Sequence, residues 1–345
     1  MGDRILLGMS GGVDSTYAVI ELRRRGFSVE GAVLKMSDNT DVFAAQKAAE
    51  ALGVRLHIVD CTDCFRRFVI ENFISEYAHA RTPNPCVVCN RFVKIAKLCE
   101  LAGALDIPYV ATGHYAGVRK DPETGRYYII KAADKRKDQS YVLGRLTQEQ
   151  LSMLYFPLFE IPKTEIRSQA LQMRLPSAEM PESQEICFIP NDDYTSYIEA
   201  AIGAFPKGKF VDEGGNVLGE HEGIIHYTIG QRKGLGISLG HPVFVSAIDA
   251  ASHTVTLSAE DAVFSDRLVC GSLNFMHLSP GNYNGIRADV KIRYSAHPEP
   301  ATVRISGDWA EVIFDRPVRA VTPGQFAVFY QEDGISFAGV IDSSQ

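Results

Sequence analysis

The N-terminal part of the chain alternates short apolar runs with amphipathic stretches. The apolar runs predict strands at 4–9, 29–34, 55–59 and 109–111. Apolar positions at helical spacing predict helices at 16–25, 42–52, 65–77 and 90–101. Gly26 and Gly53 end the first two helices, as glycine commonly does. This alternation predicts a parallel sheet covered by helices on both faces, with ligands at the carboxyl ends of its strands.

The pattern changes twice further along. A helical section covers about 148–202, where Pro162 opens one helix as proline does at a first turn. From about 205 glycine becomes frequent, and short alternating segments predict strands at 223–227, 243–248, 255–257, 288–293, 301–305, 310–314 and 327–330. This texture is typical of one or two small barrels or sandwiches. We therefore expect an α/β parallel-sheet domain with a helical extension at 1–204, followed by two small all-β domains, at 205–265 and 266–345.

Composition narrows the class of protein. The chain has 345 residues, of which 46% are hydrophobic and 22% charged, enough for buried cores in two or three domains. We see no signal peptide and no membrane span, so we expect a cytoplasmic protein with no membrane partner. Seven cysteines in such a chain favour metal binding, catalysis or burial over a disulfide framework. A net charge of −7 argues mildly against nucleic acid, although local basic clusters can still bind phosphate.

A glycine-rich loop links the first strand to the first helix. Its residues are Gly8, Met9, Ser10, Gly11, Gly12, Val13, Asp14 and Ser15. Gly11 and Gly12 can adopt positive φ, which turns consecutive backbone N–H groups toward an anion, and the helix N-terminus adds more donors. The simpler interpretation is a tight turn with Ser15 as a helix cap.

The whole string resembles the SGGxDS loop of PP-loop ATP pyrophosphatases, members of the HUP (adenine nucleotide alpha hydrolase-like) fold that adenylate a substrate oxygen. The resemblance implies ATP with Mg²⁺. It adds Leu34 and Gly113, which follow other strands, to the ATP-binding residues.

Two thiols, Cys86 and Cys89, stand at CxxC spacing in the segment RTPNPCVVCN, at the start of a predicted helix. The two prolines keep the approach out of the helix. A thiol at a helix N-terminus has a lowered pKa and is a better nucleophile or metal ligand. A third thiol, Cys187, follows the polar segment MPESQEI.

The remaining cysteines have simpler interpretations. Cys61 and Cys64 form another CxxC, and with the pair at 86 and 89 they could make a zinc site of wide spacing. An intervening helix and the absence of a glycine knuckle argue against this site. Cys99 and Cys270 lie in apolar surroundings and are expected to be buried.

The cysteine segments closely resemble those of bacterial tRNA-specific 2-thiouridylases, and the likeness runs nearly end to end. Four other segments share it: ATGHY at 111–115, KDQSY at 137–141, YTIGQRKGLG at 227–236 and TPGQ at 322–325. The resemblance implies that ATP adenylates the C2 oxygen of the wobble uridine at tRNA position 34. It makes Cys187 the persulfide carrier and Cys89 the nucleophile that forms a transient disulfide with it.

The resemblance also implies partners and contacts. The partners are tRNAs for Lys, Glu and Gln, and a cysteine desulfurase or sulfur-carrier protein as sulfur source. The target base would meet Asn84, Pro85 and Cys86. The implied tRNA contacts are His114, Lys137, Asp138, Gln139, Arg293, Tyr294 and Gln325. Basic clusters at 131–137, 207–209 and 232–233 could add phosphate contacts, as could Arg287, Lys291 and Arg293 on one face of a predicted strand.

One departure from the family leaves the sulfur chemistry open. Cys86 stands where many members have an aspartate, so this chain has a trio of cysteines at 86, 89 and 187. The trio could carry persulfide sulfur, or it could hold a [4Fe–4S] cluster whose open iron binds sulfide. Two other functions remain: an amide-forming PP-loop ligase, which needs no paired cysteines, and a zinc-stabilised RNA-binding protein.

Overall fold

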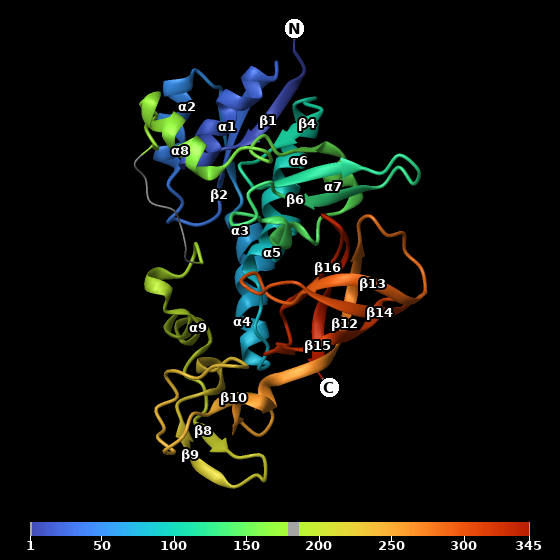
Figure 1. The fold of residues 1–345 in the computed structure, drawn as a ribbon. Coiled ribbons are helices and arrows are strands. Elements are labelled where there is room, and N and C mark those ends of the chain that lie inside the picture. The colour runs from blue at the N-terminus through green and yellow to red at the C-terminus, as the bar shows by residue number, and fades with distance from the viewer. Residues whose placement is uncertain (1, 179–185, 345) are drawn as a thin grey trace.

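A five-stranded parallel sheet forms the centre of the N-terminal part of the computed structural model, which describes residues 2–178 and 186–344 (Figure 1). The strand order is β3-β2-β1-β4-β7. Its strands are β1 (Arg4–Gly8), β2 (Ser28–Lys35), β3 (Leu56–Asp60), β4 (Tyr109–Ala111) and β7 (Leu154–Tyr155). The predicted strands therefore exist and pair in parallel, each within one or two residues of its expected bounds.

Helices cover both faces of this sheet because the central strand is apolar on both sides. Ile5 and Leu7 of β1 pack into one core and Leu6 into the other. The first face is covered by α1 (Val13–Arg24), α2 (Val42–Leu52) and α8 (Lys163–Gln172). The second face is covered by α6 (Ile95–Ala104) and α7 (Gln148–Met153). Pro162 is the N-cap of α8, one residue before the helical position expected for it.

Two long helical segments below the sheet each contain a π-helical stretch. The first comprises α3 (Thr62–Phe65), η1 (Arg66–Ile70, π-helical) and α4 (Glu71–Ala78). The second comprises α5 (Pro85–Cys89), η2 (Asn90–Lys94, π-helical) and α6. Helical periodicity predicted both segments, but the π-helical stretches, which are frequent at functional sites, were not expected.

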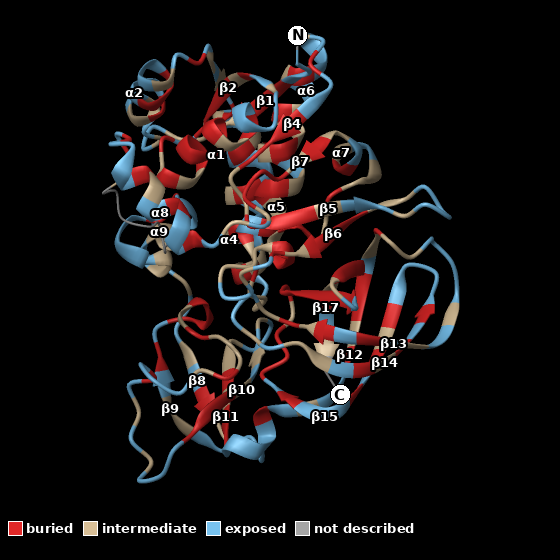
Figure 2. Ribbon diagram, turned by 45° about the horizontal axis from the view of Figure 1, so that its top comes forward, coloured by how far each residue is buried: buried red, intermediate tan, exposed pale blue. Residues whose placement is uncertain are grey.

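The C-terminal part is a closed six-stranded antiparallel barrel. Its strands are β12 (Phe264–Phe275), β13 (Tyr283–Lys291), β14 (Glu299–Ser306), β15 (Trp309–Arg319), β16 (Phe326–Gln331) and β17 (Gly334–Ser344). They follow the order β12-β15-β14-β13-β16-β17, and β17 closes the barrel by pairing with β12. The alternating buried positions of these strands fill its interior (Figure 2). Arg293 lies two residues past β13, so it does not share that strand with Arg287 and Lys291.

A hairpin of the N-terminal part extends the sheet of the barrel. Its strands are β5 (Ala116–Lys120) and β6 (Tyr127–Lys131), and Ile130 of β6 pairs with Gly334 of β17. The hairpin was not predicted. It ties the N-terminal α/β part to the barrel through backbone hydrogen bonds, so the two parts share one continuous sheet (Figure 1).

A smaller sheet lies between these parts in sequence and at the far end of α4 from the parallel sheet in space (Figure 1), with its buried side chains in the same hydrophobic cluster as those of α4. Its strands are β8 (Gly208–Val211), β9 (Val217–His221), β10 (Phe244–Asp249) and β11 (Thr254–Ser258), in the order β10-β11-β8-β9. The strand expected at 223–227 was wrong, because Ile224–His226 form a 3₁₀ turn, η5. Ile224 and Ile225 are both buried, whereas a strand would place consecutive side chains on opposite faces.

Short elements complete the chain. They are η3 (Ser140–Leu143), η4 (Pro190–Asp192), α9 (Tyr194–Ile202) and η6 (Glu260–Val263). The predicted fold class, a parallel-sheet α/β domain followed by two small β domains, is confirmed. None of the described helices is long and apolar enough to cross a lipid bilayer.

Candidate active site

The glycine-rich loop leaves the carboxyl end of β1 and turns directly into α1. Gly11 has φ +81°, and a Cβ there would lie 2.6 Å from the Ala44 carbonyl carbon, so glycine alone fits. The Ser15 hydroxyl donates to the Gly12 carbonyl at 3.0 Å and accepts from the Ser10 N–H at 3.2 Å. The loop is therefore held in shape by its own serines.

Neighbouring strand ends approach this loop. A Cβ on Gly113, just after β4, would lie 3.1 Å from the Ser15 backbone nitrogen. Leu34 is buried near the end of β2, which runs beside β1. All ten residues expected to bind ATP therefore lie on the three adjacent strands β1, β2 and β4 or just after them, toward the carboxyl edge of the sheet.

The sequence analysis missed a buried lysine beside the loop. The Lys163 ammonium lies 2.5 Å from both carboxylate oxygens of Asp14, and the Tyr115 hydroxyl donates to Asp14 Oδ1 at 2.6 Å. Lys163 is only 6% exposed. A lysine in the first turn of a helix is unfavourable next to the positive end of the helix dipole, so its position after Pro162 was a signal for an acidic partner.

The CxxC segment itself forms helix α5, five residues before the helix expected at 90–101, so the expectation that both prolines lie outside the helix was wrong for Pro85. Asn84 is the N-cap and accepts from the Val87 N–H at 3.2 Å, and Pro85 is the first helical residue. Cys86 is exposed, whereas Cys89 is buried. The Cys89 thiol lies 3.9 Å from Met36 Sδ, and Met36 directly follows β2. The thiol therefore faces the same edge of the sheet as the glycine-rich loop.

The three cysteines of the trio are close enough to influence one another electrostatically. Burial raises the pKa of Cys89 to about 12, and the neighbouring Cys187 and Cys86 add to the rise. Burial of the sulfur likewise raises the pKa of Cys86, although the residue as a whole is exposed, and burial with the charge of Cys86 raises that of Cys187. The expected lowering of a thiol pKa at this helix N-terminus was therefore wrong, because burial outweighs the helix dipole.

Lys94 is a second residue that the sequence analysis missed. Its positive charge lowers the pKa of all three cysteines in the trio, partly offsetting burial. It lies five residues after Cys89, at the end of the π-helical stretch. His114 is also near: burial, followed by the charge of Lys94, lowers the pKa of His114 to about 3, so its ring is neutral. The His114 Nδ1 lies 2.7 Å from the Thr112 hydroxyl.

The barrel holds the approach to α5 in place. The Gln325 side-chain amide donates to the Thr82 carbonyl at 2.9 Å and to the Pro83 carbonyl at 3.1 Å. The Thr82 N–H donates in turn to the Pro323 carbonyl at 2.8 Å. Gln325, expected to contact tRNA, thus uses its amide donors within the chain and positions the segment that leads to Cys86.

The segment Lys137–Gln139 also lies between the N-terminal α/β part and the barrel. The Gln139 N–H donates to the Tyr115 carbonyl at 2.8 Å, and the Gln139 amide oxygen accepts from the Tyr115 N–H at 2.9 Å. Asp138 accepts from the Ser140 hydroxyl at 2.7 Å, and that hydroxyl lies 3.0 Å from the Tyr330 hydroxyl of the barrel. Lys137 is half-buried next to them.

Tyr294 extends from the barrel toward the cysteines. It is 46% exposed, and the Lys291 ammonium lies 5.5 Å from its ring centroid. The charge of Cys86 contributes to the pKa of Tyr294, which burial raises, so the two side chains are near one another. Arg293 donates to the Ile229 carbonyl at 2.9 Å and to the Thr322 hydroxyl, while its buried Nε has no partner among the described residues. Of the predicted contacts, Tyr294 therefore has the aromatic face best exposed to a base.

The other cysteines stand apart from this trio. Cys61 is buried at the N-cap of α3, and Cys64 donates to the Phe92 carbonyl at 3.6 Å. Cys270 is buried as predicted, and Cys99 is half-buried. Within 2–178 and 186–344 no three His, Cys, Asp or Glu side chains are placed to share a metal ion, so neither the zinc nor the cluster hypothesis gains support from the geometry. The polar segment at 180–185 that precedes Cys187 lies outside the described residues.

Three family models match successive parts of the chain. They are described as a tRNA methyl transferase HUP domain (residues 3–191), a tRNA methyl transferase PRC-barrel domain (195–259) and an aminomethyltransferase beta-barrel domain (265–341). The first alone covers more than half of the chain.

Curated relatives match over their whole length. A protein of Thermoanaerobacter sp. (strain X514), named tRNA-specific 2-thiouridylase MnmA 1, is 42% identical over 357 residues, covering 99% of this chain and 98% of its own. A tRNA-specific 2-thiouridylase MnmA of Clostridioides difficile (strain 630) is 38% identical, covering 100% of this chain and 99% of its own. Among solved structures, a 4-thiouridine synthetase in complex with RNA and ATP is 18% identical over 58% of this chain and 50% of its own, with a TM-score of 0.39, too loose a likeness to bear on function.

Proposed function

The chain belongs to the tRNA-specific 2-thiouridylase family, and on that premise we propose that it uses ATP to replace the C2 oxygen of the wobble uridine of tRNA with sulfur. The observation that carries the proposal is the approach of the cysteine trio to the edge of the sheet where the glycine-rich loop lies. Cys89 reaches Met36 at the end of β2, beside β1 and its loop. An enzyme that adenylates a base and then delivers sulfur to it needs these two features next to each other.

The first step would be activation of the base. The uridine C2 oxygen attacks the α-phosphate of ATP, pyrophosphate leaves, and C2 becomes electrophilic. The loop and the N-terminus of α1 supply backbone donors for the phosphates. Lys163 already neutralises Asp14 at this place, so a magnesium ion that accompanies ATP would compete with the lysine for the carboxylate. Residues of the loop, Leu34 and Gly113 are the proposed ATP contacts.

The second step would be sulfur transfer. The terminal sulfur of a Cys187 persulfide attacks C2 and AMP leaves, which gives a C2–S–S–Cys187 intermediate. The Cys89 thiolate then attacks the Cys187 sulfur, releasing 2-thiouridine and forming a Cys89–Cys187 disulfide, which an external thiol reduces. Cys187 is exposed, as a sulfur acceptor should be, and Cys89 is buried behind it. Lys94 favours the thiolate form of both.

The target uridine has to leave the anticodon stack to reach these groups. We propose that it enters near Asn84, Pro85 and Cys86, and that Tyr294 offers it an aromatic face. His114, Lys137, Asp138, Gln139, Arg293 and Gln325 remain proposed tRNA contacts, several of which also join the parts of the protein. The proposed substrates are tRNAs for Lys, Glu and Gln, with sulfur from a cysteine desulfurase or carrier protein, in the cytoplasm where tRNA is used.

The alternative that the three cysteines hold a [4Fe–4S] cluster is tested separately. As the described sulfurs are placed they do not form a metal-binding group, so no step above runs through iron. Anaerobic purification followed by iron and sulfide analysis decides the question: fully active, iron-free protein rules the cluster out, whereas loss of activity with removal of iron would replace the persulfide route.

Reconstitution tests the function as a whole. The purified protein is incubated with unmodified tRNA, MgATP and a low-molecular-weight persulfide, and nucleosides are analysed by mass spectrometry. We expect 2-thiouridine at position 34 and one pyrophosphate per thiolated base. Pyrophosphate release that depends on an amine acceptor and not on tRNA, and that survives Cys89→Ser, would instead indicate an amide-forming ligase. Wobble uridines from cells lacking the protein should have lost the C2 sulfur.

A further inference from the structure

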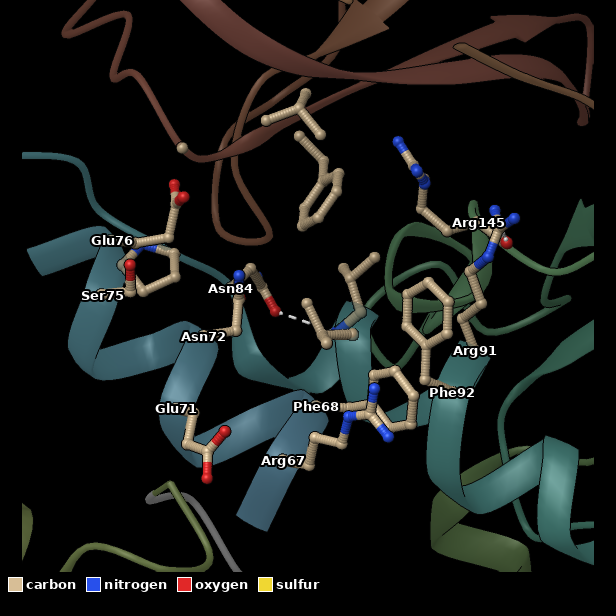
Figure 3. A pocket seen from close by; sticks show the side chains of 16 residues that line it. Arg67, Phe68, Glu71, Asn72, Ser75, Glu76, Asn84, Arg91, Phe92 and Arg145 are labelled. Carbon is tan, nitrogen blue, oxygen red and sulfur yellow. Dashed lines mark hydrogen bonds between the residues drawn. The ribbon is translucent and has the colours of Figure 1, made fainter. Parts of the chain in front are cut away.

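A groove of about 490 Å³ lies beside α5, on the side that does not carry the reactive thiols (Figure 3). Asn84, Val87 and Val88 line it, whereas Cys86 and Cys89 do not. This division follows from the helical period, because positions three and four apart share a face. The volume is in the range of pockets that hold a ligand or a few inserted side chains. A molecule in the groove would therefore rest on the same short helix that carries both thiols.

The two π-helical stretches meet at the rim of this groove. Phe68 of η1 and Phe92 of η2 stack with ring centroids 5.4 Å apart and an angle of 11° between the rings. They are 37% and 39% exposed, unusually open for two phenylalanines in contact. Because π-helical turns are frequent at functional sites, two of them side by side that expose aromatic rings indicate a surface kept for a partner.

Three guanidinium groups point to an acidic partner. Arg91 donates to the Arg145 carbonyl at 2.8 Å and to Asn274 Oδ1 at 2.9 Å, and Arg145 donates to the Ser272 carbonyl at 2.6 Å. Arg67 lies over the Phe68 ring at 5.5 Å. Within the described chain none of these three forms an ion pair with a carboxylate, and burial lowers the pKa of Arg145 to about 10. Arg91 and Arg145 are half-buried and Arg67 is exposed, and guanidinium groups that are not paired with a carboxylate favour an anionic ligand.

The opposite wall of the groove excludes a polyanion. Glu71 and Glu76 stand on α4 across from Arg91 and Arg145, as Figure 3 shows. Arg66 pairs with Glu71 at 3.3 Å and Arg81 pairs with Glu76 at 2.8 Å, so the cations on this side are already neutralised and leave no partner for a row of phosphates. Base stacking is also hindered, because Arg67 covers Phe68 and Arg91 covers Phe92 at 5.2 Å, while the inner faces stack on each other. A groove with an apolar floor and separate acidic and basic walls suits a protein segment better than RNA.

We propose that this groove is the docking site of the protein that supplies sulfur, which inserts an apolar side chain onto the floor and sets carboxylates against Arg67, Arg91 and Arg145. The inference rests on the proposed function, since only a sulfur-transferring enzyme needs such a partner. Docking on this face of α5 would hold the donor beside the helix of Cys86 and Cys89 while leaving the face of both thiols to the uridine. Of the proposed base contacts Asn84, Pro85 and Cys86, Asn84 alone borders the groove.

The test compares two sulfur sources that deliver the same atom. A persulfide-loaded cysteine desulfurase and glutathione persulfide both pass sulfane sulfur to the Cys187 thiolate, so R–S–SH becomes R–S⁻ and Cys187 becomes the persulfide, with no net oxidation. The double variant Arg67→Glu/Phe68→Ala changes the groove through two exposed residues, and Arg67 makes no ion pair within the described residues. Arg316→Glu, an exposed residue of β15 that lies outside the groove, is the matched control.

We expect the double variant to need about tenfold more desulfurase for half-maximal thiolation, and to bind the desulfurase about tenfold more weakly by titration calorimetry. With glutathione persulfide its rate should stay within about twofold of the parent, as should its affinity for tRNA. The Arg316→Glu control should behave as the parent in every assay, because the substitution reverses one exposed charge away from the groove.

Three results would overturn the inference. They are an unchanged desulfurase requirement, an equal loss with both sulfur sources, and a loss confined to tRNA affinity, which would make the groove an RNA site. Failure of the proposed function looks different: the parent protein would thiolate tRNA with neither source, and the docking inference would fall with it.

Discussion

Two pairs of cysteines with the same spacing have very different surroundings. Cys61–Cys64 and Cys86–Cys89 both begin helical segments that follow a strand or an extended run. Burial raises the pKa of Cys61 to about 11 and that of Cys89 to about 12, so the buried thiol of each pair is shifted in the same direction. The difference lies in what the rest of the chain brings to them.

The pair at 86 and 89 is surrounded by contributions from distant parts of the sequence. Cys187 supplies a third thiol, Gln325 fixes the approach, and Tyr294 stands nearby. The pair at 61 and 64 has Lys97 as its cation, and Lys97 is itself paired with Glu100 at 2.6 Å. The CxxC spacing therefore gives both pairs the same local arrangement. Which pair has a third thiol and an ordered approach beside it depends on residues from distant parts of the chain.

Serine substitution should separate the two pairs most strongly. Cys89→Ser or Cys187→Ser should lower thiolation by about 1,000-fold or more, because each removes a sulfur that has to form a covalent bond. Cys64→Ala should leave the rate within about threefold of the parent. The measurement is 2-thiouridine formed per minute with saturating tRNA and persulfide. An equal loss of thiolation rate on substitution in either pair would contradict the conclusion that only the 86–89 pair belongs to the active site.

Removal of the barrel's support should produce the next largest effect. Gln325→Leu leaves the carbonyls of Thr82 and Pro83 without their donor, which should cost about 1–3 kcal/mol of unfolding free energy in urea. Gln325→Glu keeps the shape but places a carboxylate against those carbonyls. It should be at least as unstable at pH 8, and should recover part of the loss as acidification protonates the carboxylate. If both variants were as stable as the wild type, the hydrogen bonds from Gln325 to Thr82 and Pro83 would not be needed to hold this segment.

Two lysines allow a paired experiment on charge. Lys94→Met removes the cation that lowers the pKa of Cys89 and Cys187, so their pKa values should rise further and thiolation at pH 8 should fall by about three- to tenfold. Lys97→Met removes the corresponding cation near Cys61 and should not change the rate. The pH profile of alkylation, followed by mass spectrometry, should move to higher pH at the 86–89 pair in the first variant only. Identical shifts at both pairs would contradict the assignment.

The smallest effect concerns pH in the unmodified protein. The raised pKa values of Cys61, Cys86, Cys89 and Cys187 mean that these thiols are protonated at neutral pH, and the thiolate fraction rises by about tenfold per pH unit below the pKa. Iodoacetamide labelling should therefore accelerate with pH. The exposed residues Cys86 and Cys187 should react before the buried Cys61. If Cys61 reacted first at pH 7, its surroundings would be more open than the fold indicates.

Local signals account for what the sequence predicted well. The helix at Val42–Leu52 was predicted to the residue because its apolar period ends at Gly53, which adopts the left-handed conformation that stops a helix. The glycine-rich loop was predicted at its place between β1 and α1 because turn residues act locally. The positive φ expected there is found at Gly11, whereas Gly12 has φ −71°. The roles of the predicted site residues remain predictions.

What sequence reasoning missed depends on distant partners. Lys94 lowers the pKa of Cys187, and Lys163 donates to Asp14. Each partner is far away in the sequence, and neither lysine belongs to a recognisable motif. The β5–β6 hairpin has weak alternation of its own, and its place in the structure comes from β17. The raised thiol pKa values come from burial by several elements, which the local helix signal could not reveal.

The pairing of β6 with β17 has a consequence for how the protein is made. Ile130 emerges from the ribosome long before Gly334, the residue with which it pairs, so the edge of the hairpin stays open through most of synthesis. The barrel also closes only when β17 reaches β12. The segment leading to the reactive thiols, which Gln325 holds, thus acquires its final shape late. On the proposed function, a nascent chain would bind nucleotide early and gain an ordered sulfur-transfer site only near the end of translation.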